Sequence, residues 1–202
     1  MLHLLDVLAS GVHDTKNQLF IAEAMVTATE ARTQTDLSEI RYAIETAAAR
    51  LSQTLATYHL LRHGSSISIT PVIISDLCEE AGLAQKHHLA ASHIELEIDC
   101  QVDEAWPLDR DLVSDALNNA IQNAARFAKN HIRLSAQLTE AGLCLRVEDD
   151  GPGFSSLPPA SGTGLQLAER LASLHTRKER PGHLHLANGG TLGGAVFECH
   201  LP

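Results

Sequence analysis

Apolar residues recur every three or four positions through the first third of the chain, which is the spacing of a helix with one packing face. One series runs from Leu5 to Val26 and a second from Leu37 to Leu61. The pattern breaks at Thr33-Gln-Thr-Asp36, where Asp36 and Glu39 match a capping box that begins the second helix. The basic turn Arg62-His63 and the glycine after it predict that this helix ends at residue 64.

Two helices joined by a short turn form an antiparallel helical hairpin. A hairpin has only two layers and leaves part of its apolar seam uncovered. Pairing two copies into a four-helix bundle removes that exposure. We therefore expect residues 1–64 to form a dimerisation domain and the protein to be a homodimer.

From Ser65 onward, alternating strand patterns mix with helical ones, which predicts an α+β fold with a second domain over residues 65–202. Strands and helices that pack as an α/β two-layer sandwich account for this order. The predicted strands cover residues 66–70, 94–98, 131–137, 143–148, 184–186 and 195–200. The predicted helices cover residues 75–88, 109–128 and 166–174. The segment Thr176–Arg180 is expected to be a solvated loop.

The charge balance excludes some classes of partner. The formal net charge is −10 and no run of basic residues occurs, which argues against a surface for nucleic acid or an anionic membrane. No apolar run reaches the roughly 20 residues that span a bilayer, so we expect a cytoplasmic protein. The four cysteines are widely spaced in apolar surroundings, which predicts buried thiols and no disulfide framework. The twelve histidines are scattered without the spacing of metal ligands, so we expect no zinc site.

Chemistry is first suggested by a polar stripe on the helix over residues 109–128. Asp115, Asn119, Asn123 and Arg126 recur at four, four and three residues and so share one face. A solvated face is the ordinary interpretation of such a stripe. The alternative is a ligand site, because amide oxygens can bind Mg²⁺ and an arginine can bind phosphate.

A second candidate is the strand that ends at Asp149, next to Gly151 and Gly153. A turn-forming aspartate is one interpretation. A fixed carboxylate that accepts a hydrogen bond from an exocyclic amine, such as that of adenine, is the other. The glycines let the backbone approach a ligand closely. A second glycine pair, Gly162 and Gly164, lies only a short segment downstream and would close a small lid.

The third candidate is His13, which is followed by Asp14, Lys16 and Asn17 on the first helix. Spacings of three and four residues place His13, Lys16 and Asn17 on adjacent surface. A surface histidine without a role fits this placement. A nucleophilic imidazole with a neighbouring base fits it too.

With these motifs in hand, nearly the whole chain resembles a two-component sensor histidine kinase, in a compact form without a sensor domain. Residues His13–Leu19 resemble the phospho-acceptor box, and residues 119–124 resemble the N box. Asp149-Asp-Gly-Pro-Gly153 resembles the first glycine box and Gly162-Thr163-Gly164-Leu165 the second. Gly194 to Pro202 resembles the usual end of such kinase domains.

The resemblance implies an N-terminal histidine-phosphotransfer hairpin and a GHKL-type (Bergerat-type) ATP-binding domain that uses ATP and Mg²⁺. His13 would be the phosphorylated residue, Asp14 its general base, and Asn17 would place a water or phosphoryl group. Asn123 would bind the metal. The other implied nucleotide-binding residues are Asn119, Arg126, Asp149, Gly151, Gly153, Gly162, Thr163, Gly164 and Leu165.

The resemblance also implies a partner: an aspartate on a response-regulator receiver domain would accept the phosphoryl group. Because the sequence shows no sensor or transmembrane region, we expect either a separate sensor protein to supply the signal or the protein to be an intermediate in a relay. Other functions remain open. The chain could be a histidine phosphotransferase of a phosphorelay that keeps the kinase fold without using ATP, with a phosphatase role beside either activity. It could instead be a dimeric adaptor without catalysis. An anti-sigma serine kinase would share the ATP fold but would not need His13.

Overall fold

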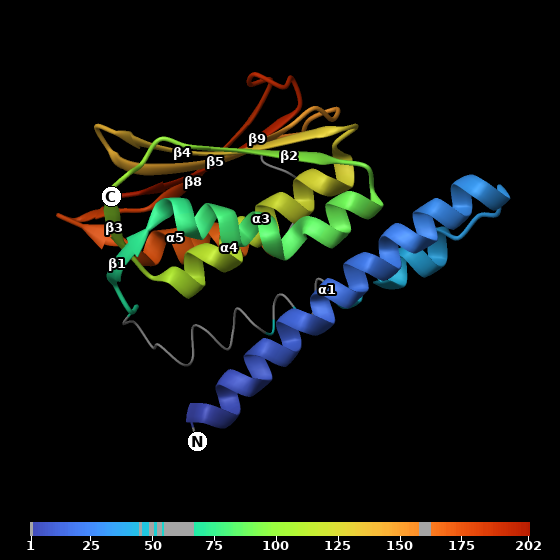
Figure 1. Ribbon diagram of the computed structural model, residues 1–202, viewed down its shortest axis with the longest axis horizontal. Helices are drawn as coiled ribbons and strands as arrows, with labels where there is room; N and C mark the ends of the chain where they lie inside the picture. The colour runs from blue at the N-terminus through green and yellow to red at the C-terminus, as the bar shows by residue number, and fades with distance from the viewer. Residues whose placement is uncertain (1, 45, 49–50, 52–53, 55–66, 158–162) are drawn as a thin grey trace. The chain divides into compact units, whose positions relative to one another are not determined.

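The computed structural model describes residues 1–202 except 1, 45, 49–50, 52–53, 55–66 and 158–162 (Figure 1). Contacts between Cα atoms divide the chain into two compact units, Met1–Arg62 and His63–Pro202. Within the described part of the chain, no helix is both long enough and apolar enough to cross a membrane.

The first unit begins with α1 (Leu2–Thr33), and the chain is helical again over residues 38–44 and 46–48. Phe20 and Glu23 are buried, whereas Leu19, Ala22 and Val26 of the predicted seam are half-buried. The best-covered line of α1 therefore lies one residue beyond the predicted seam. The predicted end of the second helix lies outside the described residues, and the full helical hairpin and the dimer remain predictions.

The break between these helices is held by Glu30. Its carboxylate accepts a hydrogen bond from Leu37 N–H at 2.9 Å and forms an ion pair with Arg41. Asp36 accepts a hydrogen bond from Ser38 N–H, but the first intrahelical bond runs from Arg41 N–H to Leu37 C=O. Leu37 is thus the N-cap residue, and the predicted cap at Asp36 was one position too early.

The second unit is built on a five-stranded sheet of order β2-β4-β5-β9-β8 (Figure 1). β2 and β4 are parallel, and the other neighbouring strands are antiparallel. The strands are β2 (Glu95–Cys100), β4 (His131–Thr139), β5 (Gly142–Asp149), β8 (His183–Asn188) and β9 (Ala195–Leu201). β4, β5, β8 and β9 each extend a predicted strand by one to three residues, whereas β2 begins one residue later than predicted and ends two residues later.

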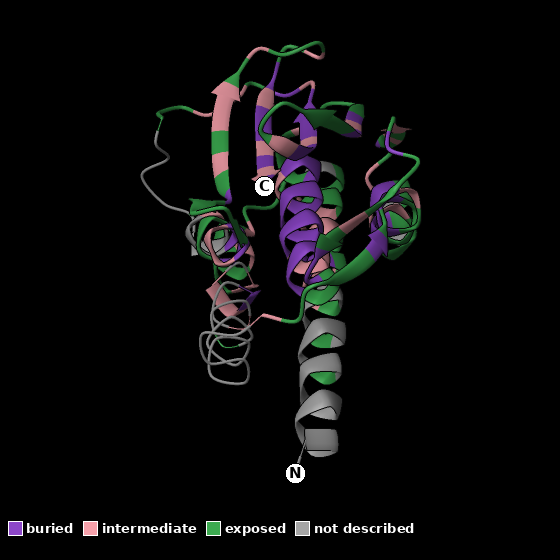
Figure 2. Cartoon of the chain, turned by 90° about the vertical axis from the view of Figure 1, so that its left-hand side faces the viewer, coloured by how far each residue is buried: buried purple, intermediate pink, exposed green. Residues whose placement is uncertain are grey.

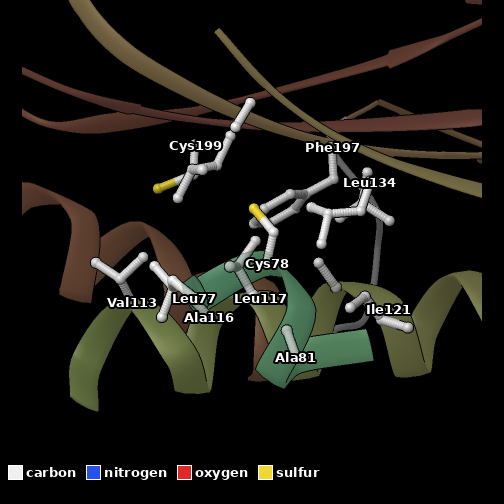
Figure 3. Close-up of a cluster of buried hydrophobic side chains, with 14 of the residues drawn as sticks. Leu77, Cys78, Ala81, Val113, Ala116, Leu117, Ile121, Leu134, Phe197 and Cys199 are labelled. Atoms are coloured by element: carbon white, nitrogen blue, oxygen red, sulfur yellow. The ribbon is translucent and has the colours of Figure 1, made fainter. Parts of the chain in front are cut away.

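Three helices cover one face of this sheet: α3 (Ile74–Ala91), α4 (Arg110–Phe127) and α5 (Thr163–Leu174) (Figure 1). Buried residues, purple in Figure 2, gather between the helices and the sheet. Leu77 of α3, Leu117 and Ile121 of α4 and Phe197 of β9 belong to this core (Figure 3). The mixed sheet with helices on one face is the predicted α+β two-layer architecture.

All four cysteines are free thiols. Burial is the main reason that the pKa of Cys78 and that of Cys199 rise to about 12, and that of Cys144 to about 11. Those three thiols stay protonated at neutral pH, where they pack as small apolar groups.

A two-stranded sheet was not predicted correctly. β1 (Thr70–Ile73) pairs antiparallel with β3 (Ala105–Leu108), and Pro71 faces Pro107 in the register. The prediction ended a strand before Pro71 and had none at β3, because proline cannot donate to a ladder. In a two-stranded ribbon, each strand has one open edge, and proline is tolerated there.

The segment after α5 is also more ordered than the predicted solvated loop. β6 (Thr176–Arg177) pairs with β7 (Arg180–Pro181), and the linking residues Lys178 and Glu179 have φ of 49° and 62°. Two consecutive residues at positive φ are typical of a type I′ hairpin turn. Neither residue is a glycine or asparagine, so the sequence carried no turn signal there.

His175, at the end of α5, ties three segments together. Its Nε2 atom accepts a hydrogen bond from Asp109 N–H at 3.0 Å, and its Nδ1 atom lies 3.1 Å from Leu171 C=O. Asp109 in turn caps α4, because its carboxylate accepts hydrogen bonds from Leu112 N–H and Ser68 N–H. The imidazole must therefore be neutral, with its proton on Nδ1.

Burial lowers the pKa of His175 below its usual value of 6.5. As the pH falls below 6.5, the unfolded chain takes up this proton first, so the native state loses stability in that window. We expect His175→Gln to lower the free energy of unfolding by about 1 kcal/mol at pH 7.5. We also expect the free energy of unfolding of this variant to fall less between pH 7 and pH 5 than that of the unmodified protein.

Urea unfolding of both proteins at a series of pH values, followed by circular dichroism, measures this difference. The pKa of His88 is also lowered by burial, and its effect is common to both proteins. Parallel stability curves for the two proteins over this range would contradict the assignment to His175.

Candidate functional site

The polar stripe of α4 is less exposed than a solvated face. Asn119 is buried with 9% of its surface accessible, Asn123 and Asp115 are half-buried, and Arg126 is exposed. Phe127, expected on the apolar face, is 60% exposed at the end of the helix. An asparagine held inside a helical layer is costly unless its amide is bonded. This burial weakens the solvated-face interpretation.

Asp149 lies at the end of β5, where its side chain is only 3% exposed. Its Oδ1 atom accepts hydrogen bonds from Gly151 N–H at 2.8 Å and from Ala195 N–H at 3.2 Å. The backbone N–H of Gly194 donates to Asp149 C=O at 2.9 Å. The carboxylate is therefore fixed by two backbone segments, one just after β5 at Gly151 and one at the start of β9 at Ala195.

Burial is the largest influence on Asp149 and raises the pKa of its carboxyl, against the two backbone N–H donors that lower it. The neighbouring charges of Asp150 and Glu148 raise this pKa further. The protein thus holds a carboxylate where its charge is unfavourable. Such placement is common where a ligand supplies the missing partner.

Two glycines make the close contacts around Asp149. A Cβ atom on Gly151 would lie 2.3 Å from Phe127 C=O, the last residue of α4. A Cβ atom on Gly194 would lie 2.2 Å from Asp149 Oδ1. Any side chain at either position would push β5, α4 and the β8–β9 turn apart. Gly151 was predicted as a site residue, whereas the steric role of Gly194 was not.

Asp150 has a different role from Asp149. Its carboxylate accepts hydrogen bonds from Lys129 N–H at 2.7 Å and from Asn130 N–H at 3.1 Å. Its small burial raises the pKa, but the backbone donors of residues 129–131 outweigh that effect and lower it. Asp150 therefore anchors the loop after α4, whereas the Asp149 carboxylate is held at the end of β5 by Gly151 and Ala195.

The second glycine of the first box begins the segment toward α5. Gly153 has φ of +79°, and a Cβ atom there would lie 2.6 Å from Asn188 Oδ1. Asn188 holds the next residue on both sides: its Oδ1 accepts from Phe154 N–H at 2.7 Å, and its Nδ2 donates to Phe154 C=O at 2.9 Å. Sequence reasoning missed Asn188, because nothing at the end of a strand pattern marks a partner 34 residues away.

The turn between β8 and β9, which contacts Asp149 through Gly194, is also held by Glu148, whose side chain lies on the other face of the sheet. The Glu148 carboxylate accepts hydrogen bonds from Thr191 N–H at 3.0 Å and from the Thr191 hydroxyl, and it pairs with Arg146 at 3.0 Å. Burial alone would raise the pKa of Glu148, but these donors together lower it. Glu148 and Thr191 were also missed by the sequence reasoning.

The remaining predicted residues are only partly placed. Thr163 and Gly164 are the first residues of α5, and Leu165 packs against the core. Gly162 lies outside the described residues. His13, Asp14 and Asn17 belong to α1, in the other unit. The structure therefore brings the end of α4, Asp149 and Gly151 together.

The donor set can be compared with what a nucleotide and its metal need. No group of three or more His, Cys, Asp or Glu residues in the described part of the chain is arranged for a metal. Mg²⁺ prefers few protein oxygens and keeps several waters, often bridging to phosphate. The amide oxygens of α4 suit that mode of binding, so the residues present fit a magnesium nucleotide.

Comparison with known proteins supports this interpretation. Residues 108–202 match the family of histidine kinase-, DNA gyrase B- and HSP90-like ATPases. The sensor protein PhoQ of Escherichia coli is 22% identical over 168 residues, which cover 74% of this chain and 33% of PhoQ. The chain thus spans about a third of the length of the curated relatives it matches.

Among solved structures, the histidine kinase AdeS of Acinetobacter baumannii superposes with a TM-score of 0.64, covering 90% of this chain and 94% of that one at 16% identity. The ATP binding domain of PrrB from Mycobacterium tuberculosis is 26% identical, with a TM-score of 0.51, and covers 67% of this chain and 97% of its own. Together these matches support a two-component sensor histidine kinase ATP-binding domain, which lies over residues 108–202.

Proposed function

We propose that the protein is an ATP-dependent histidine autokinase that phosphorylates His13 and passes the phosphoryl group to an aspartate of a response-regulator receiver domain. The observation that carries the ATP-binding half is the buried carboxylate of Asp149, fixed by Gly151 and Ala195 beside α4. Its Oδ2 atom is the acceptor for the exocyclic amine of adenine. A purine with a carbonyl at that position would not donate, which favours adenine nucleotides.

The phosphates lie toward the asparagines of α4 in this proposal. Asn123 would hold Mg²⁺ through its amide oxygen, with Asn119 beside it, and Arg126 would supply positive charge to a phosphate. Thr163 and Gly164 open α5, and the N–H groups of a helix N-terminus favour anions. In the sequence, Gly153 and Gly162 flank the short segment that would cover the nucleotide in this proposal.

The transfer itself asks little covalent chemistry of the protein. An imidazole nitrogen of His13 forms a bond to the γ-phosphorus, the bond to the bridging oxygen breaks, and ADP leaves with that electron pair. Asp14 accepts the imidazole proton, and Asn17 orients the phosphoryl group or a water in the reverse direction. Attack by the aspartate of the receiver domain then regenerates His13.

The first unit has features that support a dimer in this proposal. Ile21, Met25, Ile40 and Tyr42 are apolar residues with 44% to 72% of their surface exposed. A four-helix bundle formed with a second copy would cover such residues. A separate sensor protein would deliver the signal through this domain.

A phosphorelay histidine phosphotransferase without ATP use is the second candidate. The short segment between Gly153 and Gly162 favours it, because less chain is available to enclose a nucleotide. The fixed Asp149 and the buried Asn119 oppose it, since a protein that never binds ATP gains nothing from holding these groups in place.

Incubation with Mg²⁺ and ATP labelled at the γ-phosphate tests the reaction. We expect acid-labile label on the unmodified protein and none on His13→Gln, which lacks the accepting imidazole. On Asn123→Ala we expect about a hundredfold less label, an order of magnitude typical for lost positioning. His131→Gln, which removes an exposed histidine elsewhere, is the control and should label normally. A folded protein that takes no label from ATP but accepts it from a phosphorylated receiver domain would establish the phosphotransferase instead.

The variant Asp149→Asn should change the affinity for ATP without lowering the stability of the fold. Asparagine keeps an acceptor for Gly151 and Ala195 but places an amide donor against the adenine amine. Because burial raises the folded-state pKa of Asp149, its ionisation costs stability above the usual value of 3.8. We therefore expect the variant to unfold at the same or a higher temperature at pH 7, and to bind ATP about a hundredfold more weakly.

Thermal unfolding and calorimetric titration with Mg²⁺–ATP measure the two effects. Asp150→Asn is the matched control, and it should act oppositely: its folded-state pKa is lowered, so it should lose stability while its affinity changes less. Unchanged affinity in Asp149→Asn would remove Asp149 from the adenine site.

A further inference from the structure

Three amide side chains are buried between α3 and α4, where apolar packing is the rule. Gln85 of α3 is 2% exposed, and Asn118 and Gln122 of α4 are 7% and 2% exposed. Gln85 Nε2 donates to Asn118 Oδ1 at 2.9 Å, and Gln122 Nε2 lies 3.4 Å from Gln85 Oε1. Gln85 thus bonds two successive turns of α4 with one side chain. We call these three residues the amide ladder.

The amide ladder constrains how α4 is rotated about its axis. Apolar contacts are not directional, so a helix packed only by them can turn slightly at little cost. A buried amide loses much of its favourable energy when its partner moves out of hydrogen-bond range. Because Asn118 and Gln122 are four residues apart, both bonds to Gln85 are satisfied together at one rotation of α4.

The two candidate ligand residues of α4 directly follow the two ladder residues of that helix. Asn119 comes directly after Asn118, and Asn123 directly after Gln122. Neighbouring helical residues are rigidly related, about 100° apart around the axis. Whatever fixes Asn118 and Gln122 on the side of α3 therefore fixes the direction of Asn119 and Asn123.

We propose that the amide ladder positions Asn119 and Asn123 for the magnesium nucleotide, an inference that rests on the proposed function. Gln85, Asn118 and Gln122 are positioning residues that act through α4 and do not touch the ligand. The main effect of the amide ladder is to fix the rotation of α4. It contributes less to the free energy of unfolding, because buried polar groups can often be replaced by apolar ones without loss of stability. Ligand sites need their groups held to within about 0.5 Å, which explains its place behind these asparagines.

The test compares stability with affinity in three variants. Gln85→Met alone leaves Asn118 and Gln122 without their shared partner and should lower stability. The triple variant Gln85→Met, Asn118→Leu, Gln122→Met replaces every amide by an apolar group of similar shape and should recover stability. Leu77→Met, a buried substitution elsewhere in α3, is the control.

Each full-length variant is titrated with Mg²⁺ and the non-hydrolysable ATP analogue AMP-PNP by calorimetry, and its unfolding is followed in urea. We expect the triple variant to be as stable as the unmodified protein and to bind the analogue about tenfold more weakly. We expect Leu77→Met to bind normally. A role in stability alone predicts that affinity returns with stability, so normal binding by a stable triple variant would overturn the proposal.

Two further readouts cover the remaining cases. If the triple variant does not fold, Gln85→Met is titrated under conditions where it is fully folded, and normal affinity there overturns the proposal equally. If the unmodified protein binds no nucleotide, the proposed function fails, but the ladder is still tested in the free protein. The side-chain NH₂ resonances of Asn119 and Asn123 should shift and broaden in the triple variant and not in Leu77→Met, and identical spectra would overturn the positioning role.

Discussion

The candidate site depends on one close approach, that of the end of β5 to the end of α4. Gly151 lies against the carbonyl of Phe127 with no room for a Cβ atom. Asp149 accepts hydrogen bonds from the backbone N–H groups of Gly151 and Ala195 at its Oδ1 atom and from that of Gly194 at its C=O group. The approach brings a strand, a helix and the β8–β9 turn together at a single carboxylate. Close packing of this kind transmits a change at one position to all three elements.

Three consecutive acids in β5 and just after it show how the surroundings decide the role of a side chain. Glu148 points to the outer face, where Arg146 and Thr191 stabilise its charge. Asp150 is stabilised by backbone donors of the loop after α4. Asp149, between them, is the one of the three whose pKa is raised. The alternation of a strand separates Glu148 from Asp149, and the local backbone then determines which charge is available to a ligand.

The elements that were predicted well share strong periodicity. α4 was found because its apolar face repeats over five turns, and β4 and β5 because they alternate on either side of a glycine turn. β1 and β3 were mispredicted or missed because each contains a proline, and the β6–β7 hairpin because Lys178 and Glu179 give no turn signal. Among the functional candidates, Asp149 and the asparagines of α4 carried a local motif. Gln85, Asn188 and Thr191 did not, and the motif that begins at Gly194 gave no sign of its close packing against Asp149.

The sequence by itself determined the five strands of the main sheet, the three helices of the second unit, the two-layer class and the motif residues. Periodicity, glycines and paired asparagines make this possible because they act over a few neighbouring positions. Only the tertiary structure decided which partners these residues meet. Gln85 meets Asn118 across 33 residues and Asn188 meets Phe154 across 34, and such pairs leave no trace in local spacing. The raised pKa of Asp149 likewise arises from burial, which appears only when β5 is covered. Directional bonds between distant segments are set by packing, and packing is a property of the whole fold.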